Sequence, residues 1–131
     1  AYAAIREYKE RRLIENAREL GKLLKKRLEE IKDKHISVGD VRSIGLFGAI
    51  EIVKNREKKT PFNTYVDKIQ GKPLMTERVA KKAMENGVYI NAWVSHFIIA
   101  PPLIIDKDEL LRGLNVIDES LEVADKEVEK L

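Results

Sequence analysis

The strongest pattern in the sequence is a run of apolar residues near its C-terminal end, spaced alternately four and three positions apart. The run comprises Leu110, Leu114, Ile117, Leu121, Ala124, Val128 and Leu131. This spacing places every side chain on one stripe of an α-helix. Asp106 stands three residues before Glu109, an arrangement typical of a capping box at a helix N-terminus. The fold must therefore bury one long amphipathic helix, and we favour packing within the chain over a coiled coil.

A second amphipathic stripe occupies the first third of the sequence. Its apolar residues recur at steps of four and three and are Leu13, Ala17, Leu20, Leu24, Leu28 and Ile31. Upstream, the step from Tyr8 to Leu13 is five residues, which breaks the helical phase near Arg11 and Arg12. We therefore expect a kink or a separate short helix before Leu13.

One long strand is predicted over residues 41–53, after turn chemistry at Gly39-Asp40. Alternation along this strand puts one set of residues on a single face: Arg42, Ile44, Leu46, Gly48, Ile50 and Ile52. Arg42 is the polar exception on that face, so we expect a buried guanidinium that must find anionic or carbonyl partners. We favour a structural role for Arg42 over a direct contact with substrate.

The middle of the chain is predicted to hold a loop, a helix and a hairpin. Residues 54–72 carry six lysines or arginines and no sustained period, which indicates a mobile or functional loop. A helix opens at Pro73 and Thr76 and closes at Asn86-Gly87, where glycine suits a left-handed C-cap. Short strands over residues 88–90 and 96–100 flank residues 91–95, a loop long enough to carry a binding group.

This order of elements predicts a two-layer α+β domain, in which long helices lie over a small sheet. A chain of 131 residues has the length of one ordinary domain. We therefore expect residues 1–131 to form a single domain.

Composition excludes several functional classes. The chain has no cysteine, which removes disulfides, thiolate metal sites and thiol nucleophiles. No apolar run is long enough to span a bilayer and no signal peptide opens the chain, so we expect a cytoplasmic protein without membrane partners. The formal charge of +3 comes from interleaved signs and is a weak signal for nucleic acid.

Candidate catalytic and metal-binding residues are scarce. His35 and His96 lie far apart, and neither has a second plausible ligand at helical or hairpin spacing, so we favour packing roles and expect no metal site. The sequence holds none of the familiar hydrolase, zinc, phosphate-loop or calcium motifs. The basic positions Lys22 to Lys34 are interrupted by Glu29, Glu30 and Asp33, which favours a mixed, solvated helix face. From these residues alone we name no catalytic group.

Several segments of the chain nevertheless form an ordered set. The N-terminal segments are residues 15–21 (ENARELG), 39–47 (GDVRSIGLF) and 49–53 (AIEIV). The C-terminal segments are residues 99–105 (IAPPLII), 106–110 (DKDEL), 113–114 (GL) and 117–121 (IDESL). In this order, and over essentially the whole chain, they resemble the C-terminal region of the class III pyridoxal-phosphate aminotransferases of the omega-amino-acid and 4-aminobutyrate type.

The resemblance implies that the chain is the C-terminal small domain of a fold-type I aminotransferase. In that family the lysine that anchors pyridoxal phosphate, and most of the phosphate site, belong to a large domain upstream. We therefore expect the parent enzyme to bind the cofactor, and this chain alone to hold none covalently and to be inactive. The implied partners are the large domain, a second parent subunit in a homodimer, an amino donor and a 2-oxo acid.

Two residues depart from the family pattern. Ser43 stands where the family usually has glycine, and Lys107 stands where some members carry an arginine that receives a substrate carboxylate. We therefore take Lys107 as a candidate substrate-binding residue, with a solvated lysine in the first turn of the last helix as the alternative. We take Arg42 as a residue that ties the strand to a neighbouring element or to the large domain. The alternative is a non-enzymatic domain whose helices and basic loop bind a partner protein or nucleic acid, although nucleic acid is disfavoured by the mixed charges.

Overall fold

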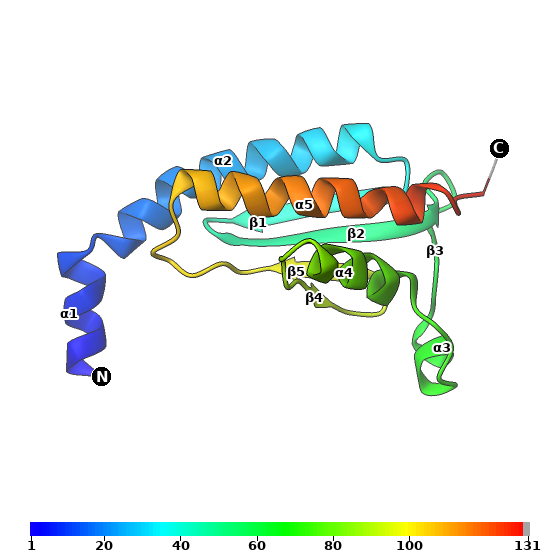
Figure 1. The fold of residues 1–131 in the computed structure, drawn as a ribbon, viewed down its shortest axis with the longest axis horizontal. Coiled ribbons are helices and arrows are strands. Elements are labelled where there is room, and N and C mark those ends of the chain that lie inside the picture. Colours follow the sequence, from blue (N-terminus) through cyan, green and yellow to red (C-terminus); the bar gives the residue numbers. More distant parts are fainter. Residues whose placement is uncertain (130–131) are drawn as a thin grey trace.

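The computed structural model describes residues 1–129 and shows the predicted α+β architecture (Figure 1). Four strands form an antiparallel sheet in the order β1 (Val38–Ile44), β2 (Phe47–Asn55), β5 (His96–Ile99), β4 (Asn91–Ala92). The short β3 (Thr60–Pro61) pairs with β2 off this path. Three helices, α2 (Leu13–Lys34), α5 (Lys107–Asp125) and α4 (Met75–Glu85), cover one face of the sheet.

The helical stripes pack within the chain, as predicted. Leu24, Leu28 and Ile31 of α2 are buried with Leu114 and Leu121 of α5 in one apolar core. The sheet contributes Val38, Val41, Ile50, Ile52, Phe97 and Ile99 to the same core. Helix α5 ends at Asp125, so Val128 follows the helix and Leu131 lies outside the described residues. Within residues 1–129, no helix is both long and apolar enough to cross a membrane.

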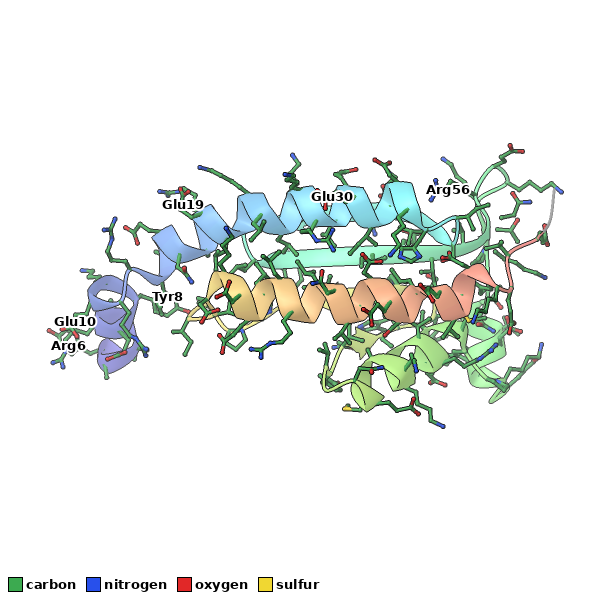
Figure 2. The ribbon with its side chains drawn as sticks, turned by 45° about the horizontal axis from the view of Figure 1, so that its top comes forward. Arg6, Tyr8, Glu10, Glu19, Glu30 and Arg56 are labelled. Carbon is green, nitrogen blue, oxygen red and sulfur yellow. The ribbon has the colours of Figure 1, made fainter. Side chains whose placement is uncertain are left out.

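The predicted break before Leu13 is confirmed. Helix α1 (Tyr2–Glu10) is separate from α2, and Arg12 at the junction has a left-handed conformation with φ of 51°. No residue of α1 is buried. In Figure 1 the helix extends beyond the N-terminal end of α2, and Figure 2 shows Arg6, Tyr8 and Glu10 on it.

The prediction of one long strand over residues 41–53 is wrong. The chain reverses at Gly45, which has φ of 53°, and β1 and β2 pair as an antiparallel hairpin. Because Ile44 pairs with Phe47 across the turn, the alternation shifts by one residue there. Ile50 and Ile52 face the helices as expected, whereas Arg42 and Ile44 lie on the opposite face and are exposed.

The segment between β2 and α4 is more ordered than the predicted loop. It contains β3 and the one-turn helix α3 (Tyr65–Ile69), which begins with a capping box between Thr64 and Asp67. Hydrogen bonds that Lys72 and Thr64 donate to the Asp67 carboxylate lower its pKa to about 2. This capping box was missed because its helix is too short to show a period.

The end of α4 and the following hairpin agree with prediction except at one strand. Gly87 has φ of 85°, as the left-handed C-cap requires. The backbone N–H of Val88 donates to the carbonyl of Ala83 at 3.0 Å, which ends the helix. Residues 88–90 form no strand, and pairing begins only at Asn91, opposite Ile98. The predicted first strand was therefore placed three residues too early.

Candidate functional site

The loop between β4 and β5 presents an aromatic pair at the surface. The rings of Trp93 and His96 are stacked, with centroids 6.2 Å apart and an interplanar angle of 5°. Trp93 is 47% exposed, and Lys68 of α3 places its Nζ 5.4 Å from the Trp93 ring. The Thr76 hydroxyl of α4 donates to the Trp93 carbonyl and anchors the loop. This arrangement suits the predicted binding loop, since a cation and two flat rings meet there.

An apolar cavity of about 480 Å³ lies beside this hairpin, under the start of α5. Its walls come from the segment before β4, from β5, from the Pro101-Pro102 turn and from α5. Asn91, Tyr89 and Glu109 supply its polar side chains, and no lysine lines it. The Glu109 carboxylate already accepts from the backbone N–H of Asp106 in the capping box. The cavity can therefore admit an aliphatic group more readily than a charged one.

The turn that precedes α5 is fixed from the opposite end of the chain. The Asn16 side-chain amide on α2 donates to the carbonyls of Leu103 and Ile105 at 2.7 and 3.0 Å. These bonds satisfy carbonyls that follow the Pro-Pro turn and hold the N-terminus of α5 against α2. The sequence offered no signal for this contact, because Asn16 lies 87 and 89 residues from its partners.

The two predicted site residues are placed apart, and no hydrogen bond or ion pair among residues 1–129 joins them. Lys107 is the first residue of α5 and is exposed. It does not line the apolar cavity, although Glu109 does. The substrate-binding role of Lys107 stays a prediction.

Arg42 is not buried, contrary to the expectation from the strand pattern. Its side chain is 57% exposed, and its guanidinium donates to Asp40 at 2.7 Å and to Glu51 at 3.2 Å. These two hydrogen bonds raise the pKa of Arg42. The anionic partners were expected, but they lie on the solvent-exposed side of the sheet because the chain reverses at Gly45. Its role at a domain interface stays a prediction.

His35 has a packing role, as predicted, in a buried polar cluster that joins α2 to α5. The ring is 1% exposed, with Nε2 2.8 Å from an Asp118 carboxylate oxygen and Nδ1 2.5 Å from one of Asp125. Ionised carboxylates only accept hydrogen bonds, so a ring nitrogen that carries a proton donates to the carboxylate beside it. Ser37 donates to Asp125 through its hydroxyl and its backbone N–H.

Asp118 is the centre of this cluster. It accepts from Lys34 at 2.5 Å and from Arg27 at 3.3 Å, besides its contact with His35. Burial raises the pKa of Asp118, but the hydrogen bonds from Lys34 and His35 outweigh burial and lower the pKa below its usual range. Asp118 was missed because it follows Ile117 on the helix and gives no sign of facing His35, 83 residues away.

The C-terminal end of α2 is capped by a residue from the turn that follows β2. Arg56, labelled in Figure 2, donates to the carbonyls of Lys32 and His35 at 2.8 and 2.6 Å. A guanidinium at the end of a helix satisfies carbonyls that have no partner within it.

The basic and acidic residues of α2 form mixed pairs such as Arg27 with Glu30, as expected for a solvated face.

The described residues do not fit a covalent site for pyridoxal phosphate. Every lysine of residues 1–129 is exposed except Lys32, which is half-buried and paired with Asp40 at 3.2 Å. A lysine that holds a cofactor covalently must lie in a closed site that excludes water. Residues 1–129 also contain no group of three or more His, Cys, Asp or Glu side chains placed to hold a metal.

Comparison with known proteins finds one matching family and several related enzymes. Residues 1–121 match the family described as aminotransferase class-III. The chain is 37% identical to the adenosylmethionine-8-amino-7-oxononanoate aminotransferase of Aquifex aeolicus, over 99% of this chain and 26% of that protein. It is 32% identical to the leucine/methionine racemase of Thermococcus litoralis, over 92% of this chain and 25% of that protein.

The fold also matches solved structures. The taurine:2-oxoglutarate aminotransferase of Bifidobacterium kashiwanohense, in complex with PLP and glutamate, superposes with a TM-score of 0.82 at 31% identity. The match covers 98% of this chain and 28% of that one. The chain therefore spans about a quarter of the length of the relatives that it matches.

Proposed function

This chain belongs to the class III aminotransferase family, and we propose that it is the C-terminal small domain of a larger pyridoxal-phosphate-dependent transaminase. The parent enzyme transfers an amino group between an amino acid or omega-amino acid and a 2-oxo acid. Residues 1–131 form one domain of it, and the large domain lies upstream in the same polypeptide. The chain by itself is inactive.

The observation that carries this proposal is the match to a taurine:2-oxoglutarate aminotransferase, which covers nearly all of this chain but little more than a quarter of the other protein. Such coverage fits one domain of a longer enzyme. Residues 1–129 hold no enclosed lysine, which supports a cofactor-anchoring lysine in the large domain. Pyridoxal phosphate, bound by the large domain, supplies the capacity to stabilise charge beside the substrate amino group.

The residues of this chain contribute binding and enclosure. The Trp93 loop offers flat rings beside Lys68, and the apolar cavity next to Asn91 can receive an aliphatic portion of a substrate. Closing these surfaces over the active site excludes water from the reaction. Lys107 offers a point charge for a substrate carboxylate, in place of the planar fork of an arginine.

The test is a substrate screen with the full-length parent enzyme. Purified holoenzyme is incubated with an α-amino acid, an omega-amino acid and taurine, each with 2-oxoglutarate. The proposal predicts that glutamate appears in step with loss of the donor, and that the 131-residue chain alone gives none. Because one relative is a racemase, chirality is followed as well. Racemisation of an amino acid without any consumption of the 2-oxo acid contradicts the proposal.

Assembly and location complete the proposal. We expect the parent to be a homodimer in the cytoplasm. Sedimentation of the purified enzyme can check that it is a dimer. The alternative of a non-enzymatic nucleic-acid-binding domain predicts an affinity for generic DNA that falls steeply with salt. The mixed charge pairs on α2 argue against such binding.

A further inference from the structure

Helices α2 and α5 lie side by side in Figures 1 and 2, and the imidazole ring of His35 joins them. Nε2 of the ring lies 2.8 Å from Oδ1 of Asp118, and Nδ1 lies 2.5 Å from Oδ2 of Asp125. The ring is only 1% exposed, so both nitrogens depend on these carboxylates for partners. We name the three residues His35, Asp118 and Asp125 the His35 cluster.

Two contacts of this kind need two ring protons. A neutral imidazole carries one N–H, and its other nitrogen is an acceptor, as an ionised carboxylate is. With a neutral ring, one contact of the His35 cluster therefore brings two acceptors together at 2.5 or 2.8 Å without a proton between them. That contact is unfavourable, because the buried ring nitrogen is left without a donor. A second ring proton turns both contacts into charge-assisted hydrogen bonds.

The contacts of the two carboxylates place this second proton on the ring. Burial raises the pKa of Asp118, but the hydrogen bonds from Lys34 and His35 lower it below its usual range, so Asp118 is ionised near neutral pH. Oδ1 of Asp125 accepts from the backbone N–H and the hydroxyl of Ser37. Among residues 1–129, Asp125 forms an ion pair with His35 alone. A charged ring therefore supplies the counter-charge that Asp125 otherwise lacks.

The charges around the His35 cluster come from α2, from α5 and from the turn after β2. The groups that reach the cluster directly or through one partner are Arg27, Glu30, Lys34, Arg56, Asp118, Glu122 and Asp125. Four of them are anions and three are cations, so a doubly protonated ring brings the two signs to equal numbers.

The position of His35 on α2 acts in the same direction. His35 is the C-cap residue of this helix, where the partial negative charge of the helix end favours a cation. The nearby cations Arg27, Lys34 and Arg56 act in the opposite direction, because like charges disfavour the charged form of the ring. The ring therefore holds its second proton over a limited range of pH.

We propose that the His35 cluster is a pH-sensitive latch between α2 and α5. At neutral pH the ring carries both protons and binds Asp118 and Asp125, which joins the C-terminal end of α2 to the C-terminal half of α5. As the pH rises, the ring loses one proton and one carboxylate then faces a nitrogen without a donor. Helix α5 is held less firmly in that state. The latch is a property of the fold and does not rest on the proposed function.

Rising pH should weaken the fold through this cluster. In an unfolded chain, a histidine ring has lost its second proton at about pH 8. The folded cluster still holds the proton at that pH, so the folded state binds more protons than the unfolded state and stability falls as the pH rises. The contribution is complete below about pH 6 and disappears when the folded cluster releases its proton.

Nuclear magnetic resonance of the histidine rings tests the protonation directly. The full-length holoenzyme is labelled with carbon-13 at Cε1 of histidine, and the His35 resonance is the one lost in His35→Gln. His96→Gln, at a half-buried ring outside the cluster, must leave that resonance in place. If His35→Gln does not fold, Asp125→Asn gives the assignment, because it changes the surroundings of the same ring.

A histidine-containing peptide in the same buffer marks the resonance positions of the neutral and the doubly protonated ring. At about pH 8, where the ring of the peptide is neutral, His35 should appear at the doubly protonated position. A His35 resonance at the neutral position overturns the inference.

Two carboxylate-to-amide variants of the full-length holoenzyme test the latch. At about pH 7, Asp125→Asn should lower the melting temperature by about 3 °C, because the charged ring loses an anionic partner. At about pH 10 this effect should fall to less than half, since a neutral ring no longer gains from the carboxylate.

Glu127→Gln is the matched control, because Glu127 pairs with Arg78 at 2.7 Å on the surface. An arginine stays protonated throughout this range, so the effect of Glu127→Gln should not change with pH. An effect of Asp125→Asn that stays constant from about pH 7 to about pH 10 overturns the latch. An equal pH dependence for the two variants also overturns it.

Discussion

Asp118 is a buried carboxylate that three basic side chains contact. Its carboxylate contacts Lys34, Arg27 and the ring of His35, and it is among the buried residues of α5. Each of these contacts joins α5 to α2, so the cluster holds together two helices that are far apart in sequence. Removing the shared carboxylate takes one partner from the buried His35 ring, which keeps Asp125, and one from Arg27, which keeps Glu30. The exposed Lys34 loses its hydrogen bond as well.

We therefore expect Asp118→Ala to lower the free energy of unfolding by about 2 kcal/mol, through the loss of charge-assisted hydrogen bonds. Glu119→Ala, at the adjacent exposed position on α5, should change it by less than about 0.5 kcal/mol. Urea denaturation followed by circular dichroism measures both. Similar losses for the two variants would show that the cluster is not a major source of stability.

The lowered pKa of Asp118 also predicts a pH dependence. A carboxyl with a depressed folded-state pKa stabilises the fold above its unfolded pKa of about 3.9, and this contribution disappears as the pH falls through the folded pKa. The difference in unfolding free energy between wild type and Asp118→Asn should therefore be constant from pH 5 to 6 and shrink below about pH 4. A difference that grows on acidification contradicts this assignment.

Lys107 carries the prediction that concerns substrate. If its ammonium receives a carboxylate in the parent enzyme, Lys107→Ala should raise the Michaelis constant for an amino acid while sparing an amine without a carboxylate. Lys126→Ala, on an exposed lysine just after α5, serves as the matched control. Steady-state kinetics with both donors decide the matter, and equal effects on the two would remove Lys107 from the site.

Single residues were predictable where local pattern decides their environment. The capping pair Asp106 and Glu109 and the left-handed Gly87 follow from spacing and backbone chemistry, and both are observed. The burial of His35 was expected, but its partners Asp118 and Asp125 come from a helix more than 80 residues away. No local pattern connects such positions, and the cluster is visible only in three dimensions.

Among the elements, α2 and the β1–β2 turn approach each other closely. A Cβ built on Gly21 would lie 2.7 Å from Cα of Gly45, so the helix and the hairpin approach backbone to backbone. Gly45 cannot easily accept a side chain either, because its φ is 53°. This close approach lets the β1–β2 hairpin pack directly against α2.

We expect Gly21→Ala to destabilise the protein by about 1–3 kcal/mol, since the added methyl must push two backbones apart. Gly113→Ala is the matched control, because Gly113 also lies in a helix and a Cβ there meets nothing within 4 Å. That control should stabilise the protein by up to about 1 kcal/mol through helix propensity. Thermal melts of the two variants test this, and a stabilised Gly21→Ala would rule out the close approach.

Elements were predictable in proportion to the length of their pattern. The stripes on α2 and α5 span many turns, and both helices begin where they were expected. The β1–β2 hairpin was interpreted as one strand because apolar residues continue at every second position through the two-residue turn. The chain nevertheless reverses there, and the face on which these residues lie changes. The error mattered for function, because it placed Arg42 on the buried face of the sheet instead of the solvent-exposed face.

At the scale of the whole molecule, the core lies on one side of the sheet and is covered by helices there. The opposite face of the sheet, α1 and the loop around Trp93 keep apolar side chains in solvent. Composition and periodicity predicted the α+β class but no chemistry. The family came from short segments such as the one around Pro101-Pro102, and the match over residues 1–121 confirms it.

The proposed division of the parent enzyme into two domains makes one direct prediction about the cofactor. The full-length holoenzyme is reduced with borohydride to fix pyridoxal phosphate on its lysine, digested and mapped by mass spectrometry. The 131-residue chain is treated with pyridoxal phosphate in the same way. Our account predicts one stoichiometrically labelled lysine in the parent, upstream of this sequence, and no stoichiometric label in the chain alone. A single, fully labelled lysine within residues 1–131 would contradict it.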